Sequence, residues 1–177
     1  MEQYEMFELS FEGEVPAKSH TVIDLEAIFK TENMEKKVKG FYAGNGIYKV
    51  RFLPQIAGEY QWEIHGCVEA SGKTVCEAAP EEGRQHGIVH AQATYFVHDD
   101  GTEFLPFGTT IYALAHQREE LLIQTYETLK NAPFNKIRHC VFPKYYDYNH
   151  DEPEFFAFEK DANGNWDMDH PNFVFWD

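Results

Sequence analysis

The sequence is short of cysteine and of long apolar runs, and each shortage argues against a class of protein. Its three cysteines, Cys67, Cys76 and Cys140, are an odd number with no CxxC spacing, which favours a reducing cytoplasm over a disulfide framework. The first residues form neither a basic n-region nor a long apolar h-region, and no stretch approaches transmembrane length. We therefore expect a cytoplasmic protein with no secretory signal and no membrane partner.

Positive charge is also scarce. The chain carries 15 Lys and Arg against 30 Asp and Glu, which gives a formal net charge of -15. Such a field repels phosphate backbones and anionic lipid, so nucleic acid is not an expected partner. The same acidity is also explained by solubility alone.

Several motifs of catalysis and cofactor binding do not occur. The sequence contains no HExxH or CxxC metal spacing, no GxSxG nucleophile elbow and neither GxGxxG nor GxxxxGK[ST]. The pairs His139 with Cys140 and His116 with His150 lack a spacing that would place metal ligands on one face. We therefore predict no metal site and no cofactor.

Aromatic residues are abundant, with 15 Phe, 10 Tyr and 3 Trp among 177 residues. This excess is typical of proteins that stack flat apolar ligands such as sugar rings, although aromatics also fill β-rich cores. Composition alone leaves both interpretations open.

Residues 1–84 read as an antiparallel β-sandwich of immunoglobulin type. Short alternating runs such as "TVIDLEAIFK" and "GEYQWEIHG" are separated by turn residues about every ten positions, and "YAGNGIY" indicates a tight hairpin. In "YQWEI" the alternation places Tyr60, Trp62 and Ile64 on one face, so Trp62 should be largely buried. The polar segment 80–87 is the expected linker.

Residues 88–177 follow a different pattern. A hairpin around Asp99, Asp100 and Gly101 leads into an apolar strand at 104–108. A helix is predicted over "REELLIQTYETLKNAPF", ended by Pro133, and "NKIRHCVFPKYY" reads as a second apolar strand. Strand, helix and strand of this length form a βαβ unit, whose parallel strands belong to an α/β sheet or barrel.

In a βα barrel, residues just beyond the C-terminal ends of the strands form the floor of the active site. His116 follows the first predicted strand, and Arg138 lies in the second. The loop "PKYYDYNHDEP" then mixes aromatic faces with charged and amide groups, as carbohydrate sites do; it contains Lys144, Tyr145 and His150. Packing against the sandwich would explain some of these aromatics equally well.

Most of the chain resembles a known family. The segments "FLPFGTTIYALAHQ", "TLKNAPFNKIRHCVFPKYYDYNHDEP" and "WDMDHPNFVFWD" are similar to the opening of the apiosidase-like (β/α)8 glycoside hydrolases, which belong to a large clan of retaining barrels. The segment "GFYAGNGIYKVRFLPQIAGEYQWEIHG" is similar to the β-sandwich domain that precedes the barrel in many of these enzymes. The order sandwich, hairpin, "FGTT", helix and "NKIR" is matched along the chain.

The resemblance implies roles for individual residues. Arg138 occupies the position where barrels of this clan hold an arginine near the nucleophile carboxylate, although a salt bridge on a barrel rim is the simpler alternative. His116 could donate a hydrogen bond to a sugar hydroxyl, although a lone histidine is more often structural. The predicted substrate-binding residues are His116, Arg138, Lys144, Tyr145 and His150.

The resemblance also implies that the catalytic residues are missing. A retaining glycosidase needs two carboxylates about 5 to 5.5 Å apart, and in this clan they follow the fourth and seventh strands. A complete barrel takes about 250 residues, whereas residues 88–177 number ninety. The closing "DHPNFVFWD" reads as a helix start at Asp169 or His170, cut off after barely two turns. Asp147, Asp151, Glu152 and Glu154 are therefore surplus loop acids.

The sequence thus predicts a mainly β protein in which an immunoglobulin-like antiparallel β-sandwich, residues 1–84, precedes the first βαβ portion of a truncated (β/α)8 barrel, residues 88–177. We expect the N-terminal fragment of a glycoside hydrolase that binds a glycoside or oligosaccharide in its full-length form and is inactive alone. We expect the exposed barrel strands either to pack back on the sandwich or to drive self-association with another copy of the chain. The alternative is a complete, non-catalytic protein whose sandwich binds carbohydrate or a protein partner and whose second half is a small α+β appendage.

Overall fold

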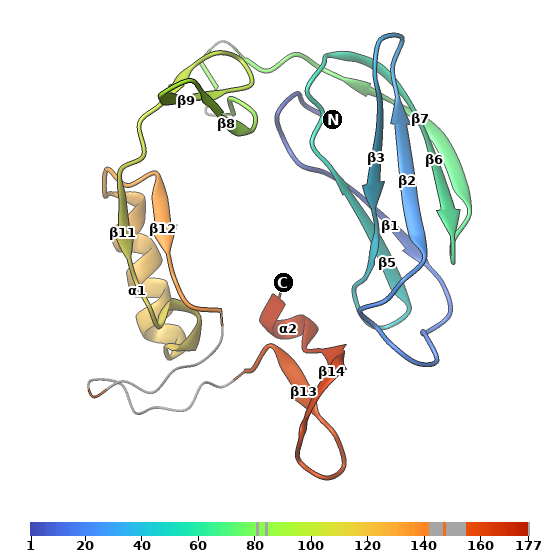
Figure 1. Ribbon diagram of the computed structural model, residues 1–177, viewed down its shortest axis with the longest axis vertical. Helices are drawn as coiled ribbons and strands as arrows, with labels where there is room; N and C mark the ends of the chain where they lie inside the picture. Colours follow the sequence, from blue (N-terminus) through green and yellow to red (C-terminus); the bar gives the residue numbers. More distant parts are fainter. Residues whose placement is uncertain (81, 84, 142–146, 148–154, 177) are drawn as a thin grey trace. The chain divides into compact units, whose positions relative to one another are not determined.

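The chain folds into two compact units, residues 1–104 and 105–177 (Figure 1). The computed structural model describes residues 1–80, 82–83, 85–141, 147 and 155–176. Antiparallel strands make up most of the regular structure, so the mainly β prediction is confirmed. The domain limits expected from the sequence, residues 1–84 and 88–177, stay a prediction.

Two antiparallel sheets form most of the first unit. The three-stranded sheet has the order β1–β5–β4, and the four-stranded sheet has the order β3–β2–β6–β7. The strands are β1 (Phe7–Glu12), β2 (Leu25–Lys30), β3 (Glu35–Lys39), β4 (Phe41–Tyr42), β5 (Ile47–Phe52), β6 (Gly58–Gly66) and β7 (Ala70–Cys76). This arrangement confirms the predicted sandwich, whereas its immunoglobulin type stays a prediction.

The core of the sandwich lies between these two sheets. Phe29 of β2 stacks on Phe52 of β5 with ring centroids 4.0 Å apart and planes 5° apart. Tyr60 of β6 meets the edge of Phe52 at 5.5 Å, and Phe7 meets Phe29 at 6.5 Å. Such offset and edge-on contacts between aromatic rings add to the burial of apolar area. The two sheets are thus joined by their aromatic side chains.

Alternation along the strands decides which side chains enter this core. In β2, Leu25, Ala27 and Phe29 are buried, as the period of two requires. In β6, Tyr60 and Ile64 are fully buried on the same face, which confirms the predicted register. Trp62 is only partly buried, contrary to expectation: its ring lies over Gly72 of β7, which has no side chain to cover it from that side, and meets the Phe11 ring at 6.3 Å.

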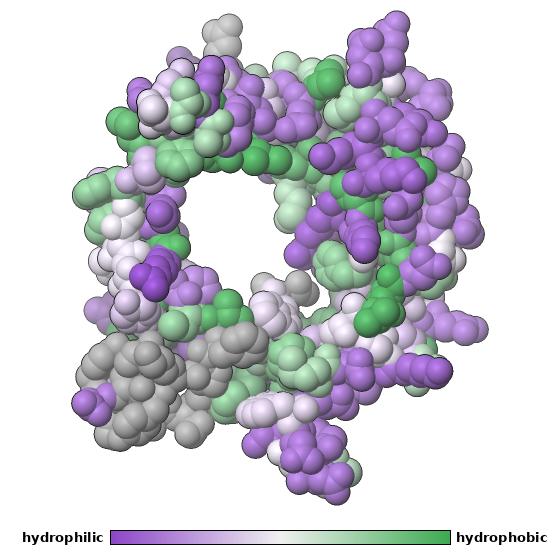
Figure 2. Space-filling model, in the orientation of Figure 1, coloured by the Kyte–Doolittle hydropathy of each residue, from purple (hydrophilic) through white to green (hydrophobic). Residues whose placement is uncertain are grey.

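Strand β3 was not expected from the sequence. It pairs with β2 at the edge of the four-stranded sheet, and four of its five residues are exposed. Edge strands often carry lysine, which discourages pairing with another chain, and three of the five residues of β3 are lysines. Hydrophilic residues accordingly cover much of the visible sandwich surface, as Figure 2 shows.

A small third sheet completes the first unit. It consists of β8 (Val89–Gln92), β9 (Tyr95–His98) and β10 (Glu103–Phe104), and the predicted hairpin joins β9 to β10. One carboxylate fastens this hairpin: Asp99 Oδ2 accepts hydrogen bonds from Gln55 Nε2 at 2.9 Å and from the Ile88 amide at 2.8 Å. Since Gln55 lies between β5 and β6, this sheet is tied to the sandwich.

The second unit begins with the predicted βαβ arrangement. Strand β11 (Gly108–Thr110) is followed by the 3-10 helix η1 (Leu114–His116), helix α1 (Glu119–Lys130) and strand β12 (Lys136–Arg138). Strands β11 and β12 pair in parallel. The strand expected at 104–108 is instead split between β10 and β11.

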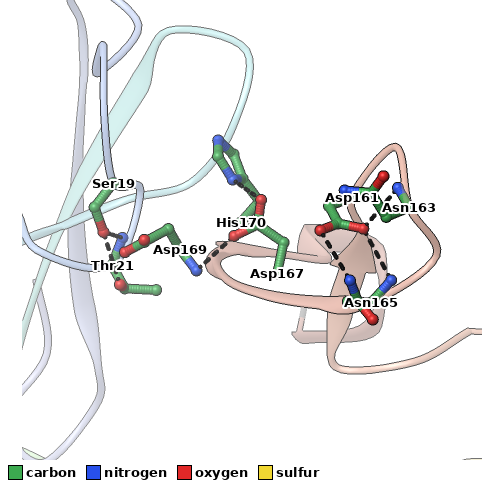
Figure 3. A network of polar contacts seen from close by, with 8 residues as sticks. All are labelled: Ser19, Thr21, Asp161, Asn163, Asn165, Asp167, Asp169 and His170. Atoms are coloured by element: carbon green, nitrogen blue, oxygen red, sulfur yellow. Dashed lines mark hydrogen bonds and ion pairs between the residues drawn. The ribbon is translucent and has the colours of Figure 1, made fainter.

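The unit ends with a hairpin and a short helix. Strands β13 (Phe158–Lys160) and β14 (Trp166–Pro171) pair antiparallel, and α2 (Phe173–Trp176) follows. Asp161 Oδ1 accepts the backbone amides of Asn163 and Asn165, both at 2.9 Å, within the turn (Figure 3). The expected helix start at Asp169 or His170 is wrong: these residues lie in β14, and Asn172 begins the helix, its Oδ1 accepting the Val174 amide.

Candidate functional site

The C-terminal ends of β11 and β12 lie side by side. Thr110 and Arg138 are the last residues of their strands, and they pair with each other. The ladder extends one step further, because the Ile111 amide donates to Arg138 O at 2.9 Å and the Cys140 amide to Tyr112 O at 3.0 Å. The segments that follow both strands are therefore held together at one edge.

Arg138 lies over an aromatic ring at this edge. Its guanidinium carbon is 5.6 Å from the centroid of the Tyr112 ring. Such a cation–π contact favours one orientation of the planar group while its N–H donors can still bind a carboxylate or hydroxyl. Both side chains are exposed, so an anionic or hydroxylated group can reach the guanidinium from solvent.

His116 lies in a different environment. It is buried, with 6% of its surface exposed, in helix η1. Its Nε2 donates to the Val141 carbonyl at 3.2 Å, and its ring faces Phe175 with centroids 6.1 Å apart. Burial lowers the pKa of His116, and neighbouring His139 lowers it further, although the Val141 hydrogen bond opposes this. The neutral imidazole thus fastens the chain after β12, and its substrate-binding role stays a prediction.

The other predicted site residues, Lys144, Tyr145 and His150, lie outside the described residues. The surplus acids Asp151, Glu152 and Glu154 lie there too, whereas Asp147 is described and exposed. Among the described residues, the structure therefore places Arg138 at the end of the parallel strands and His116 in the segment that follows the first of them.

Helix α1 leaves an apolar groove on each side. One groove of about 340 Å³ includes Thr109 and Ile111 beside β11, and the other, of about 460 Å³, includes Ile137 of β12. Leu129 lines both grooves. No residue of α1 is buried, and Leu121, Ile123 and Tyr126 are exposed. The βαβ unit thus leaves apolar surface uncovered on both flanks of its helix.

A separate cavity lies at one end of the sandwich, and no pattern in the sequence predicts it. It has a volume of about 580 Å³ and is lined by Lys30, Thr31, Glu32, Asn33, Ile56, Ala57, Gly58, Glu59 and Gln61. Its residues come from two segments more than twenty positions apart. Only the pairing of β2 with β6, which sets Lys30 opposite Gln61, brings them together.

In the part of the chain that the structure describes, no three His, Cys, Asp or Glu side chains gather so as to hold a metal ion. None of the described helices is long and apolar enough to cross a membrane.

These features define a two-sheet β-sandwich protein with a parallel βαβ unit. The model of a family described as a domain of unknown function (DUF5060) matches residues 1–66, which lie in the sandwich. No curated protein matches the chain.

The whole chain is similar to one solved structure in particular. That protein, from Bacteroides vulgatus ATCC 8482, is described as a "putative glycoside hydrolase". The two share 34% sequence identity with a TM-score of 0.88 over 99% of this chain. This chain spans 36% of the length of the Bacteroides vulgatus protein. The similarity therefore includes the sandwich and the βαβ unit together.

Proposed function

We propose that this chain is the N-terminal part of a retaining, apiosidase-like glycoside hydrolase. The observation that carries the proposal is the similarity to the Bacteroides vulgatus protein, at 34% identity over 99% of the chain. Carbohydrate is then the substrate class, as the aromatic composition also suggests. A reducing cytoplasm is the proposed compartment, because the three cysteines are an odd number with no CxxC spacing.

In this proposal, β11, α1 and β12 are the first strand, helix and second strand of a (β/α)8 barrel. The parallel pairing of β11 with β12 supports it, because parallel strands joined by a helix occur in barrels and doubly wound sheets. The two apolar grooves beside α1 support it as well, since each lies where the helix of a neighbouring βα unit would pack in a closed barrel.

The chemistry would take place beyond the C-terminal ends of β11 and β12. Arg138 would orient the nucleophile carboxylate and keep it ionised through two parallel hydrogen bonds. Lys144, Tyr145 and His150 would contact the sugar from the loop after β12. His116 would fasten that loop through Val141 while contributing to the same face of the site.

The catalytic acid and nucleophile would lie on later strands of the barrel, in residues that this chain does not include. The proposal therefore predicts that residues 1–177 alone hydrolyse no glycoside. Measurable turnover of aryl glycosides by the isolated chain would show that the catalytic groups have been wrongly placed.

A substitution at Arg138 tests the proposed site. In the polypeptide encoded by the complete gene, Arg138→Ala should lower kcat about 100-fold, in the range seen when one charge-stabilising group is removed. KM should change little, because the guanidinium acts on the nucleophile and its developing charge. Steady-state kinetics on an aryl glycoside that the unsubstituted enzyme cleaves measure both constants.

Lys136→Ala is the matched control, because Lys136 lies at the opposite end of the same strand. It should leave kcat and KM unchanged. Equal kcat values for Arg138→Ala and the unsubstituted enzyme would exclude a role for the guanidinium in catalysis.

A further inference from the structure

The cavity at the end of the sandwich has the form of a binding site. Its volume of about 580 Å³ falls within the range of about 300 to 1,000 Å³ that is typical of small-molecule sites. It lies where β2 ends and β6 begins, and the β2–β3 turn and the β5–β6 loop form its sides. All of its lining residues belong to the first unit, within residues matched by the domain of unknown function.

Both sides of the cavity are held by hydrogen bonds. The Tyr60 side chain is fully buried, and its hydroxyl donates to Ile56 O at 2.9 Å and accepts from the Ile56 amide at 3.3 Å. In the opposite turn, the Thr31 amide donates to Met34 O at 2.8 Å, and Thr31 Oγ1 accepts the Asn33 amide at 3.3 Å. A ligand would therefore meet a preformed shape, which reduces the entropy lost on binding.

Two charged groups of the lining already have partners outside it. Lys30 Nζ lies 3.6 Å from Glu35 Oε2, and Lys73 Nζ lies 3.0 Å from Glu59 Oε1. Glu32 adds a further negative charge to the lining, and the whole chain carries a net charge of -15. Anionic ligands, including acidic sugars, are therefore repelled.

The polar groups that remain are amides. Within the described part of the chain, the side-chain amides of Asn33 and Gln61 make no hydrogen bond with other residues. An amide offers both donors and an acceptor, and a sugar hydroxyl needs both kinds of partner. Beside them, Ile56 is 40% exposed and, with Ala57, presents an aliphatic surface. Amides next to an aliphatic wall suit the C–H and hydroxyl faces of a neutral sugar.

We propose that this cavity binds a neutral saccharide, with Asn33 and Gln61 as its hydrogen-bonding residues and Ile56 as its apolar contact. This site is separate from the one at the ends of β11 and β12 and goes beyond the proposed hydrolysis. The sandwich would hold part of a polysaccharide without cleaving it.

Nuclear magnetic resonance titration of the isolated chain tests the proposal. Backbone amide signals would be followed while cellohexaose, xylohexaose, maltohexaose or mannohexaose is added, with an oligogalacturonate as the acidic counterpart. We expect at least one neutral hexaose to shift signals at residues 30–33 and 56–61, and no shift with the oligogalacturonate. Shifts confined to residues 108–116 and 136–140 would place sugar binding at the proposed catalytic edge and overturn this proposal.

The double variant Asn33→Ala/Gln61→Ala should weaken binding of the hexaose about tenfold or more, because it removes two hydrogen-bonding side chains. Glu63→Ala is the matched control, since Glu63 lies two residues from Gln61 on the same face of β6 and outside the cavity. The spectrum of each variant shows whether it is folded. Unchanged affinity in a folded double variant, or no shift with any neutral hexaose, would overturn the proposal.

Discussion

His116 shows how burial changes the chemistry available to one side chain. Its Nε2 donates to Val141 O, and its surroundings lower its pKa from the usual value of 6.5. The folded state therefore binds this proton less readily than the unfolded state does. The free energy of unfolding should then fall as the pH drops from about 6.5 toward the lowered pKa, and should be fully restored above 6.5.

Chemical denaturation of the isolated chain at several pH values from about 6.5 downward measures this decrease in the free energy of unfolding. His116→Gln keeps a donor for Val141 but does not titrate, so the part of the pH dependence that His116 causes should disappear. An unaltered pH profile in His116→Gln would show that His116 does not cause the effect.

The side chain of Asn135 supports the pairing of β11 with β12 by forming hydrogen bonds with two backbone groups next to β11. Asn135 Oδ1 accepts the Phe107 amide at 2.8 Å, and its Nδ2 donates to Leu105 O at 2.9 Å. These bonds extend a parallel pair of only three residues a side. Asn135→Ala should therefore speed hydrogen exchange of the Phe107 amide about fivefold, the effect of losing about 1 kcal/mol.

Asn131→Ala is a suitable control for this element. Asn131 follows α1, and its side chain donates to Glu127 O within the helix end, away from the strands. Exchange at Phe107 should not change in that variant. Equal exchange rates at Phe107 in both variants would mean that the backbone bonds alone hold the pair.

At the scale of the whole molecule, the second unit exposes an unusual amount of apolar surface. Leu105, Phe107, Ile123 and Ile137 are all exposed, and the last two line the same groove. Contiguous apolar patches of this kind favour association. We expect the isolated chain to self-associate, so its average mass in static light scattering should rise with concentration.

The double variant Ile123→Lys/Ile137→Lys should shift this association to higher concentration, because it places two like charges in the groove. Val22→Lys is the control, since Val22 is 81% exposed but lies in the first unit. A monomer at every concentration reached would show that the exposed surface of the second unit does not drive association.

Local patterns were sufficient to predict most elements. The alternation in β2, the Gly44–Asn45–Gly46 turn with positive φ at all three residues, and the helical spacing of α1 each reflect a rule that acts over a few neighbours. They failed at β3, whose mostly exposed residues carry no alternation, and at Pro171, where pairing with β13 extends a strand. In both cases the partner strand decided the structure.

The sequence by itself determined the class of fold, because periodicity and turn residues are properties of short segments. It also placed Arg138 in the second strand of the βαβ unit; the structure ends that strand at Arg138 and leaves its three residues exposed, whereas the sequence predicts a longer, buried strand. Only the tertiary structure decided that His116 is buried against Val141 and that Asn33 and Gln61 line one cavity. These facts depend on contacts between residues far apart in the chain, and no local pattern encodes such contacts.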